Sequence, residues 1–457
     1  MAKTVRPARD SAGSATLQLT EVGRFLIQNF GCRATQADGA ALSRMLHQHG
    51  MAPAERAGEA DLVILNTCTV TSAADEDVRQ AVRRVHHENP EAKILVTGCY
   101  AQRAPEELAV LPGVAWVVGN SHKHRIPDIV SEAGSPVPYH GQVHVGDIFA
   151  QTDFLAAPVE EAVDDRTRPN LKIQDGCNNR CSFCIIPFVR GRSRSAPPEF
   201  VAEQVRRLAE SYREVVLSGI NLGRWGREAG SRMRLVDLLR RLLEETAIER
   251  IRLSSVEPMD LSDDLLALMA SSPRLAKHVH APLQTGSDRV LRRMRRRYRP
   301  HHYAGRIRKA RQLMPDAAIG ADVMTGFPGE TADEFEENRR FIESLPFTYL
   351  HVFTYSARPG TPAAAMPDQV PMPVRKERNR VLRELAAAKN LEFRRRMVGR
   401  RLSAVTLGQE RVALTDNYLK VELARPRAAN QLIDLEIGGL SAQGLREADL
   451  LAILPRA

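Results

Sequence analysis

The segment Cys177-Asn178-Asn179-Arg180-Cys181-Ser182-Phe183-Cys184 decides how this sequence is interpreted. Its three cysteines have the spacing CxxxCxxC and follow the stretch 171–175 (LKIQD), which we expect to be a strand. Cysteine thiolates are the usual ligands of iron–sulfur clusters, and three on one tight loop can hold three irons of a [4Fe–4S] cluster. The fourth iron would then be open to a substrate or cofactor. Structural zinc is the alternative, but it prefers four ligands in CxxC-type pairs.

Downstream of this loop, short apolar stretches alternate with stretches of helical periodicity. The expected strands are 171–175, 214–218, 250–255, 278–284, 319–325 and 349–356. The expected helices are 198–211, 234–246, 261–271, 286–313, 331–344 and 375–397. Six such units predict a partial (βα)6 barrel over 169–397, with its chemistry at the C-terminal ends of the strands.

Upstream of the loop, a second alternating series predicts an α/β domain over 22–134. Strands are expected at 24–30, 61–67 and 93–98, with helices over 38–49 and 73–88, which favours a doubly wound parallel sheet. Cys32, Cys68 and Cys99 each follow one strand, so they should converge at one sheet edge. Small buried hydrophobes are the alternative for such cysteines. Three at equivalent strand ends favour a metal site.

The remaining segments differ in character from these two series. We expect residues 1–21 to be a flexible tail and residues 135–168, rich in Pro, Ala, Asp and Val, to be a connector. The last stretch, 398–457, carries short alternating segments broken by Gly, Asp and Asn. This pattern predicts a small antiparallel β-barrel.

Composition bounds the class of protein. The 457 residues carry a net charge of +10, so a polyanion such as nucleic acid is the first partner to consider. Apolar content of 43% and charged content of 26% are ordinary for a globular chain and exclude disorder for its bulk. No apolar run approaches a membrane span, and the first twenty residues lack an apolar signal core. We therefore expect a cytoplasmic protein without a membrane partner, in which six cysteines indicate metal or redox chemistry rather than disulfides.

The cysteine loop after the first barrel strand resembles that of the radical S-adenosylmethionine (radical SAM) superfamily. Further motifs resemble those of its methylthiotransferases, from about residue 22 to the C-terminus. They are Gly31-Cys32, Asn66-Thr67-Cys68, Gly98-Cys99, Cys184-Ile185-Ile186-Pro187 with Arg190-Gly191, Ser254-Ser255-Val256-Glu257-Pro258, Gln284-Thr285-Gly286-Ser287-Asp288, Gly326-Phe327-Pro328-Gly329-Glu330 and Tyr355-Ser356-Ala357-Arg358-Pro359-Gly360-Thr361. The resemblance implies the same three parts in the same order, with a TRAM-like RNA-binding barrel at the C-terminus.

By this resemblance, Cys177, Cys181 and Cys184 hold a [4Fe–4S] cluster that binds SAM and generates a 5′-deoxyadenosyl radical. Cys32, Cys68 and Cys99 then hold an auxiliary [4Fe–4S] cluster that carries sulfur, and a second SAM donates the methyl group. The cofactors supply this chemistry, so no side chain beyond the cluster ligands is expected to be catalytic. The resemblance also implies a flavodoxin- or ferredoxin-like electron donor and a separate sulfur source.

Five residues at strand ends are candidates to line the SAM pocket. They are Ser218, Gly219, Glu257, Gln284 and Asp322. A glycine at 219 would let SAM approach the backbone closely. The alternative is that these polar groups only satisfy loop amides.

The family acts on threonylcarbamoyladenosine or isopentenyladenosine next to the tRNA anticodon, or on a ribosomal-protein aspartate. Asn66-Thr67-Cys68-Thr69-Val70-Thr71 and Arg295-Arg296-Arg297-Tyr298 look most like the threonylcarbamoyladenosine branch, which adds the methylthio group at C2 of the base at position 37. Residues 289–311 contain eleven Arg or Lys and no Asp or Glu, which favours an RNA-binding helical arm over a solvated barrel helix. The candidate RNA contacts are Arg295, Arg296, Arg297, Arg394, Arg395 and Arg396. A hypothesis of another class is a non-catalytic RNA-binding protein with structural metal.

Overall fold

The computed structural model describes residues 23–131, 140–151, 154, 167–228, 232–409 and 411–449. The tail expected at 1–21 and much of the connector expected at 135–168 lie outside these residues. Among the described residues, no helix is long and apolar enough to cross a membrane.

The N-terminal domain is a six-stranded sheet in the order β2-β1-β3-β4-β5-β6, in which every neighbouring pair is parallel. Its strands are β1 (Arg24–Asn29), β2 (Ala52–Pro53), β3 (Leu62–Thr67), β4 (Lys93–Gly98), β5 (Val114–Gly119) and β6 (Gln142–His144). Its helices are α1 (Arg33–Gln48), α2 (Ser72–Glu88), α3 (Cys99–Arg103), α4 (Pro105–Ala109) and α5 (Ile126–Ser131). The strand order reverses between β1 and β3, which confirms the doubly wound prediction. β6 extends the sheet into the range that we assigned to the connector.

The second domain is an open barrel of six parallel strands, split into β10-β9-β7 and β11-β12-β13. A bridge between Ile251 and Leu275 joins the halves. The strands are β7 (Asn170–Asp175), β9 (Glu214–Gly219), β10 (Arg250–Leu253), β11 (His278–His280), β12 (Ala318–Thr325) and β13 (Tyr349–Thr354), and the short β8 (Arg194–Ser195) pairs antiparallel with β7. The covering helices are α6 (Ile186–Arg190), α7 (Pro198–Ser211), α8 (Leu235–Glu245), α9 (Asp263–Ser271), α10 (Asp288–Arg293), α11 (Pro300–Leu313), α12 (Ala332–Ser344) and α13 (Met372–Met397).

The barrel departs from the sequence prediction in one helix. We expected a single helix over 286–313, but α10 ends at Arg293 and α11 begins at Pro300. The chain turns between them, since Arg295 has a φ of 56° and Pro300 disfavours helical backbone in the residue before it. The basic segment is therefore two helices and a connecting loop rather than one arm.

The C-terminal domain is a closed five-stranded barrel in the order β14-β15-β16-β18-β17. Its strands are β14 (Arg401–Thr406), β15 (Val412–Thr415), β16 (Lys420–Glu422), β17 (Leu432–Leu440) and β18 (Leu445–Glu447). β16 and β18 pair in parallel, so the barrel is mixed and our prediction of an all-antiparallel barrel was wrong. Alternation along a strand predicts which face is buried but not the direction of its neighbour.

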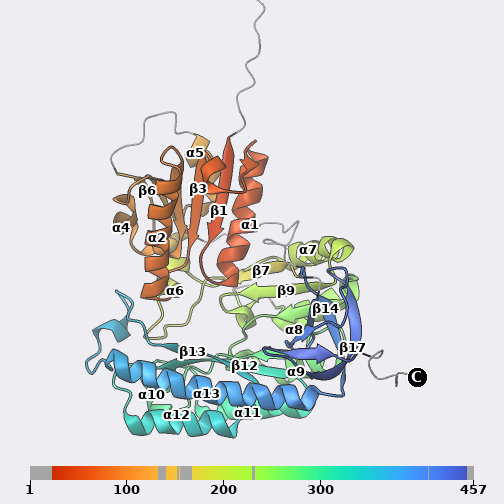
Figure 1. Cartoon of the computed structure of the whole chain (residues 1–457). Coiled ribbons are helices and arrows are strands. Elements are labelled where there is room, and N and C mark those ends of the chain that lie inside the picture. The colour runs from red at the N-terminus through yellow and green to blue at the C-terminus, as the bar shows by residue number, and fades with distance from the viewer. Residues whose placement is uncertain are drawn as a thin grey trace, which may run out of the picture.

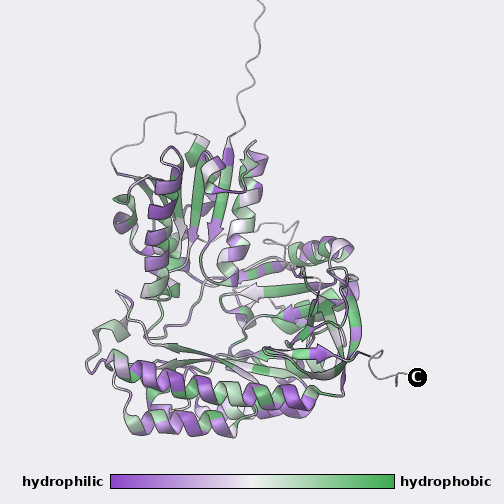
Figure 2. Cartoon of the chain, viewed as in Figure 1, coloured by the Kyte–Doolittle hydropathy of each residue, from purple (hydrophilic) through white to green (hydrophobic). Residues whose placement is uncertain are grey.

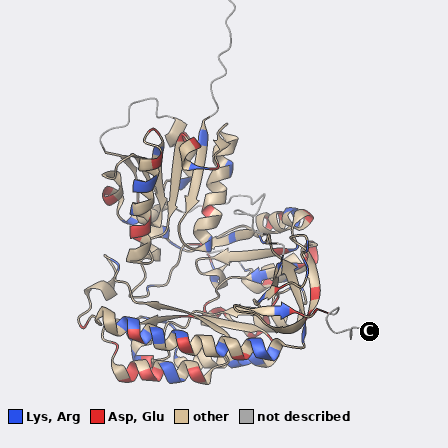
Figure 3. Ribbon diagram, viewed as in Figure 1, with Lys and Arg blue, Asp and Glu red and all other residues tan. Residues whose placement is uncertain are grey.

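Three domains pack into one body (Figure 1), with the N-terminal sheet standing above the partial barrel and the small barrel beside it. Apolar residues concentrate in the central strands, whereas the outer helices are largely hydrophilic (Figure 2) and carry both signs of charge (Figure 3). Arg358 joins the first two domains by donating to the Thr69 carbonyl at 2.7 Å and to Asp75 at 2.8 Å. Arg252 joins the last two by donating to the carbonyls of Thr415 and Asp416.

Candidate iron–sulfur and SAM site

The CxxxCxxC loop lies at the C-terminal end of β7. Two hydrogen bonds fold it: the Cys177 N–H donates to the Gly191 carbonyl at 3.1 Å and the Cys184 N–H to the Cys181 carbonyl at 3.1 Å. The Asn179 N–H and the Asn221 side-chain amide point at the Cys177 sulfur from 3.4 and 3.6 Å. Donors aimed at a sulfur stabilise a thiolate, and outer-shell hydrogen bonds of this kind orient metal ligands.

Burial disfavours the ionised form of two thiols on this loop, those of Cys177 and Cys184, and so raises the pKa of both. Burial raises the pKa of the Cys184 thiol to about 12, and the neighbouring Cys181 thiol adds to the rise. An iron held by these residues would reverse such a shift, because metal coordination deprotonates a thiol outright. Three converging thiols without a fourth fit a [4Fe–4S] cluster with one open iron better than a structural zinc site.

Arg296 connects the cysteine loop to the third barrel strand, and we did not anticipate this role. Its guanidinium lies 3.3 Å from the Cys181 sulfur, forms an ion pair with Glu257, and contacts the Tyr298 hydroxyl at 3.3 Å. The residue is only 8% exposed. This burial contradicts our assignment of Arg296 to an RNA-binding surface, because the left-handed turn at Arg295 directs the next residue inward.

The second cysteine triple assembles at the C-terminal edge of the N-terminal sheet, as we predicted from strand ends. Cys32 and Cys99 stand at the beginnings of α1 and α3, and Cys68 follows β3. Gly31 has a φ of +113°, and a Cβ there would lie 2.4 Å from the Cβ of Cys68. Only glycine therefore allows Cys32 to approach Cys68 so closely. Burial, followed by the Cys99 and Cys32 thiols, raises the pKa of Cys68 to about 12.

The short helix α6 lies next to both triples. It begins two residues after Cys184, and Cys99 packs on Val189 of this helix and on Ile185, which precedes it, in one apolar cluster. The Asn120 amide bridges both sides, with the Val189 carbonyl at 2.8 Å and the Cys99 sulfur at 3.6 Å. Both triples thus face the junction between the first two domains.

A buried ion network locks this junction, and sequence reasoning did not find it. Asp38 of α1 accepts from Lys123 at 3.1 Å, from Arg190 at 3.0 Å, and from Lys172. Asp175 accepts from Lys172 at 2.9 Å and from Arg190 at 3.0 Å. All five side chains are at most 8% exposed. Burial alone would raise the pKa of Asp38, but its three cationic partners hold it far below its usual range.

The candidate SAM residues gather at the C-terminal ends of the barrel strands. Ser218 and Gln284 are buried, and their side-chain oxygens have no hydrogen-bond partner among the described residues; the same holds for the Ser254 hydroxyl oxygen. Buried polar atoms are normally satisfied, so three orphaned oxygens at this mouth fit a polar ligand such as SAM. Gly219 differs from our expectation, since the Gln174 side chain fills the space where its Cβ would lie.

Asp322 lies on the barrel face shared with His280 and His351. It contacts the two histidines at 3.3 and 3.2 Å, and the Ser255 hydroxyl meets the other nitrogen of His280 at 2.7 Å. Burial would raise the pKa of Asp322, but these two histidines lower it well below its usual range. Its carboxylate is therefore already engaged by side chains of β11 and β13.

The other candidate RNA contacts divide into two groups. Arg295, Arg297, Arg395 and Arg396 are exposed, whereas Arg394 is half-buried. Arg394 donates to the Ser441 and Gly444 carbonyls, and Arg396 to the Pro315 carbonyl. These last two hold the C-terminal barrel and the end of α11 in place.

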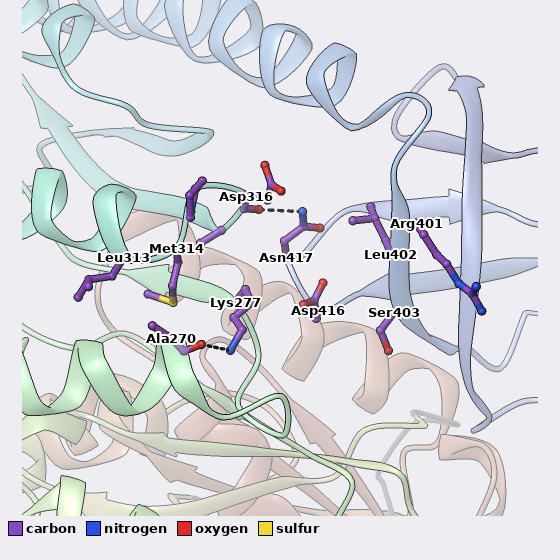
Figure 4. Close-up of a pocket in the computed structure, with 12 residues that line it drawn as sticks. Ala270, Lys277, Leu313, Met314, Asp316, Arg401, Leu402, Ser403, Asp416 and Asn417 are labelled. Atoms are coloured by element: carbon purple, nitrogen blue, oxygen red, sulfur yellow. Dashed lines mark hydrogen bonds between the residues drawn. The ribbon is translucent and has the colours of Figure 1, made fainter.

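A pocket of about 340 Å³ lies at the N-terminal end of the barrel strands, opposite the candidate SAM residues (Figure 4). Lys277 and Asp316 precede β11 and β12 there, and Ser403 and Asn417 reach it from the C-terminal barrel. Lys277 donates to three carbonyls, and Asn417 donates to that of Asp316 at 2.9 Å. These groups fasten two domains together, away from both cysteine triples.

Comparison with known proteins agrees with this geometry. Residues 171–342 match the radical SAM superfamily, and residues 24–119 match a family described as uncharacterized protein family UPF0004. The threonylcarbamoyladenosine tRNA methylthiotransferase MtaB of Aquifex aeolicus is 37% identical over 90% of this chain and 99% of its own length. The tRNA-2-methylthio-N(6)-dimethylallyladenosine synthase of Thermobifida fusca is 36% identical over 83% of this chain and 77% of its own. In fold, the radical SAM methyltransferase TsrM of Kitasatospora setae superimposes with a TM-score of 0.55 at 16% identity, covering 75% of this chain and 74% of that one.

An open six-stranded barrel with three cysteines after its first strand defines a radical SAM enzyme, a class that implies a [4Fe–4S] cluster and SAM. The chain belongs more narrowly to the radical SAM methylthiotransferase family, since relatives in that family span nearly all of it. It is an enzyme of iron–sulfur and radical chemistry, so the non-catalytic hypothesis is wrong.

Proposed function

We propose that this protein inserts a methylthio group at C2 of N6-threonylcarbamoyladenosine at position 37 of tRNA, next to the anticodon. The observation that carries the proposal is the placement of two cysteine triples next to α6, at the C-terminal edges of two sheets. Three thiols at each place can hold one [4Fe–4S] cluster, so the site suits two clusters that act on one substrate.

In this proposal, Cys177, Cys181 and Cys184 hold the radical cluster, and Cys32, Cys68 and Cys99 hold an auxiliary one. When bound, the two clusters and SAM supply the radical, the sulfur and the methyl group. The chain's own residues do the positioning. Arg296 orients Glu257 at the mouth and donates to Cys181, while the orphaned oxygens of Ser218 and Gln284 accept hydrogen bonds from SAM.

The buried ion network fixes the position of one cysteine triple relative to the other. Arg190 belongs to α6 and reaches both Asp38 of the first domain and Asp175 of the second. Buried charges lose much of their stabilisation when partners separate, so the network resists displacement of one domain against the other. Fixed geometry matters because reaction between two cofactors depends on placement within about an ångström.

Relatives of both tRNA branches are about equally similar to this chain, so we base the proposed substrate branch on the motifs. Four MtaB proteins that act on threonylcarbamoyladenosine are 34–37% identical, and synthases that act on dimethylallyladenosine are 33–36% identical. The threonylcarbamoyl branch is favoured by Asn66-Thr67-Cys68-Thr69-Val70-Thr71 and by Arg295-Arg296-Arg297-Tyr298. The dimethylallyladenosine branch is the second candidate, and a ribosomal-protein aspartate is the third.

We further propose that tRNA binds across the barrel mouth and the C-terminal domain. Arg295 and Arg395 are exposed and suit phosphate contacts, whose contribution falls steeply with salt. The target adenine must leave its stack to reach the barrel mouth, as in other base-modifying enzymes. An electron donor of flavodoxin or ferredoxin type and a sulfur source complete the cycle.

Anaerobic reconstitution followed by iron and sulfide counting tests the cluster assignment. Two [4Fe–4S] clusters give about eight irons per chain, and replacing one triple with alanines should leave about four. Stoichiometric zinc would contradict the proposal. The reconstituted enzyme, given SAM, a reductant and sulfide, is then incubated with tRNA that carries threonylcarbamoyladenosine or isopentenyladenosine. A methylthio product from the first tRNA supports the proposed branch, and one from the second alone overturns it.

A further inference from the structure

A polar pocket of about 240 Å³ opens beside the radical-SAM loop. Asn178, which follows Cys177, forms one side. Asn221 and Arg224 follow β9 and form another, and Arg297 closes it from the loop between α10 and α11. The pocket therefore sits at the C-terminal ends of the barrel strands, next to the first cluster ligand.

All eight residues around this pocket are polar or charged. Three of them are arginines and one is Glu228. Arg224 and Arg227 share the buried Asp260 behind the pocket, at 2.9 and 3.1 Å. Arg297 makes no ion pair within the described residues, so its guanidinium is the cation available to a ligand.

A second observation points to a ligand at the inner end. Asn221 is 5% exposed, and its side-chain oxygen has no hydrogen-bond partner among the described residues. Its amide nitrogen is directed to the Cys177 sulfur at 3.6 Å. A buried acceptor left open beside an unpaired arginine suits a ligand that carries both a donor and a negative charge.

Resting on the proposed function, we propose that this pocket binds the threonyl part of the substrate base and that Arg297 pairs with its carboxylate. The threonylcarbamoyl group ends in a carboxylate and a hydroxyl and carries urea N–H donors. The isopentenyl group has none of these and would leave the pocket's polar groups unpaired, which is costly. Arg297 is thereby a specificity-determining residue that selects one base modification over the other.

SAM also carries a carboxylate, so the experiment must show whether Arg297 pairs with the carboxylate of the substrate or with that of SAM. The reconstituted full-length enzyme is assayed with synthetic anticodon stem-loops bearing threonylcarbamoyladenosine or its carboxamide, which lacks the charge. The wild type should show a KM about 10- to 100-fold higher for the carboxamide, as expected for a charge-assisted hydrogen bond. Arg297→Gln should raise the KM for the acid by a similar factor, so that the variant has about the same KM for both stem-loops.

Two matched variants control the result. Arg295→Gln removes an exposed arginine two residues away and should weaken the binding of both stem-loops equally. Arg297→Lys retains the charge and should recover part of the discrimination. Iron content confirms that each variant holds its clusters.

Three outcomes would overturn the inference. The first is a wild type that does not distinguish acid from carboxamide while still forming the methylthio product, which leaves the proposed function intact. The second is an Arg297→Gln variant with an equally raised Kd for SAM in the absence of RNA, which would assign the arginine to SAM. The third is product only from isopentenyladenosine stem-loops, which overturns the proposed function as well.

Discussion

Replacing Arg296 with methionine should make the radical cluster harder to reduce. Arg296 is nearly buried, and its guanidinium lies 3.3 Å from the Cys181 sulfur. A positive charge at that place stabilises the reduced cluster more than the oxidised one, because the reduced cluster carries one more electron. Methionine has a similar length and no charge, so the substitution removes the interaction with little change in packing.

The size of the effect follows from two estimates. A hydrogen bond to a charged group contributes about 1.5–3 kcal/mol, and losing half of it from the reduced state alone lowers the midpoint potential by about 30–65 mV. A unit charge about 5 Å away at an effective dielectric constant of about 20 contributes about 3 kcal/mol, which sets an upper limit near 140 mV. We therefore expect a shift of about 30–140 mV to more negative potential.

An EPR-monitored redox titration measures this shift. It is performed on a background in which Cys32, Cys68 and Cys99 are alanine, so that a single cluster gives the signal. Arg295→Met is the matched control, since it removes an exposed charge from the neighbouring residue and should have little effect. An unchanged midpoint potential in the Arg296→Met variant, at unchanged iron content, would show that the Arg296 charge does not stabilise the reduced cluster.

Three further predictions concern stability and the separate roles of the cysteine triples. Burial alone would raise the pKa of Glu214, but its arginine neighbours lower it to about 2, so its stabilisation is present above about pH 4.5 and is lost as the pH falls toward 2. The contribution of Glu214 to the free energy of unfolding amounts to about 3 kcal/mol. Urea unfolding of the apo chain at several pH values should show that the Glu214→Gln variant lacks this acid-dependent loss. Free energies of unfolding that fall in parallel with pH in the wild type and the variant would contradict the prediction. Asp38→Asn leaves three buried cations with one carboxylate, so it should lower the free energy of unfolding by about 3–5 kcal/mol in the same assay. The control Asp434→Asn removes an exposed partner of Arg401 and should change the free energy of unfolding little. Cys177→Ala should abolish 5′-deoxyadenosine formation, whereas Cys68→Ala should retain some of it and lose the methylthio product. Chromatography with mass spectrometry measures both products. Equal loss of 5′-deoxyadenosine in the two variants would contradict separate roles for the two cysteine triples.

The architecture was predictable because its signals are local. Each barrel strand is a short apolar run, and the strands expected at 214–218 and 319–325 differ from β9 and β12 by a single residue. The convergence of Cys32, Cys68 and Cys99 followed from strand ends alone, since the C-terminal ends of parallel strands share one edge. Neither inference required knowledge of side-chain contacts.

The features that the sequence did not predict depend on contacts between distant segments. Arg296 looks like its neighbours in a run of arginines, and only the turn at Arg295 determines that it points inward. Asp38 and Arg190 are 152 residues apart, and no local pattern pairs them. The parallel pairing of β16 with β18 is likewise set by barrel closure rather than by alternation.

Nucleoside mass spectrometry of tRNA from a host that lacks this activity, with and without the gene, measures the proposed reaction itself. The gene should convert N6-threonylcarbamoyladenosine into its 2-methylthio derivative, and the Cys68→Ala variant should not. A methylthiolated isopentenyladenosine instead would contradict the substrate. No change in any tRNA nucleoside, with both clusters present, would contradict the claim that tRNA is the substrate.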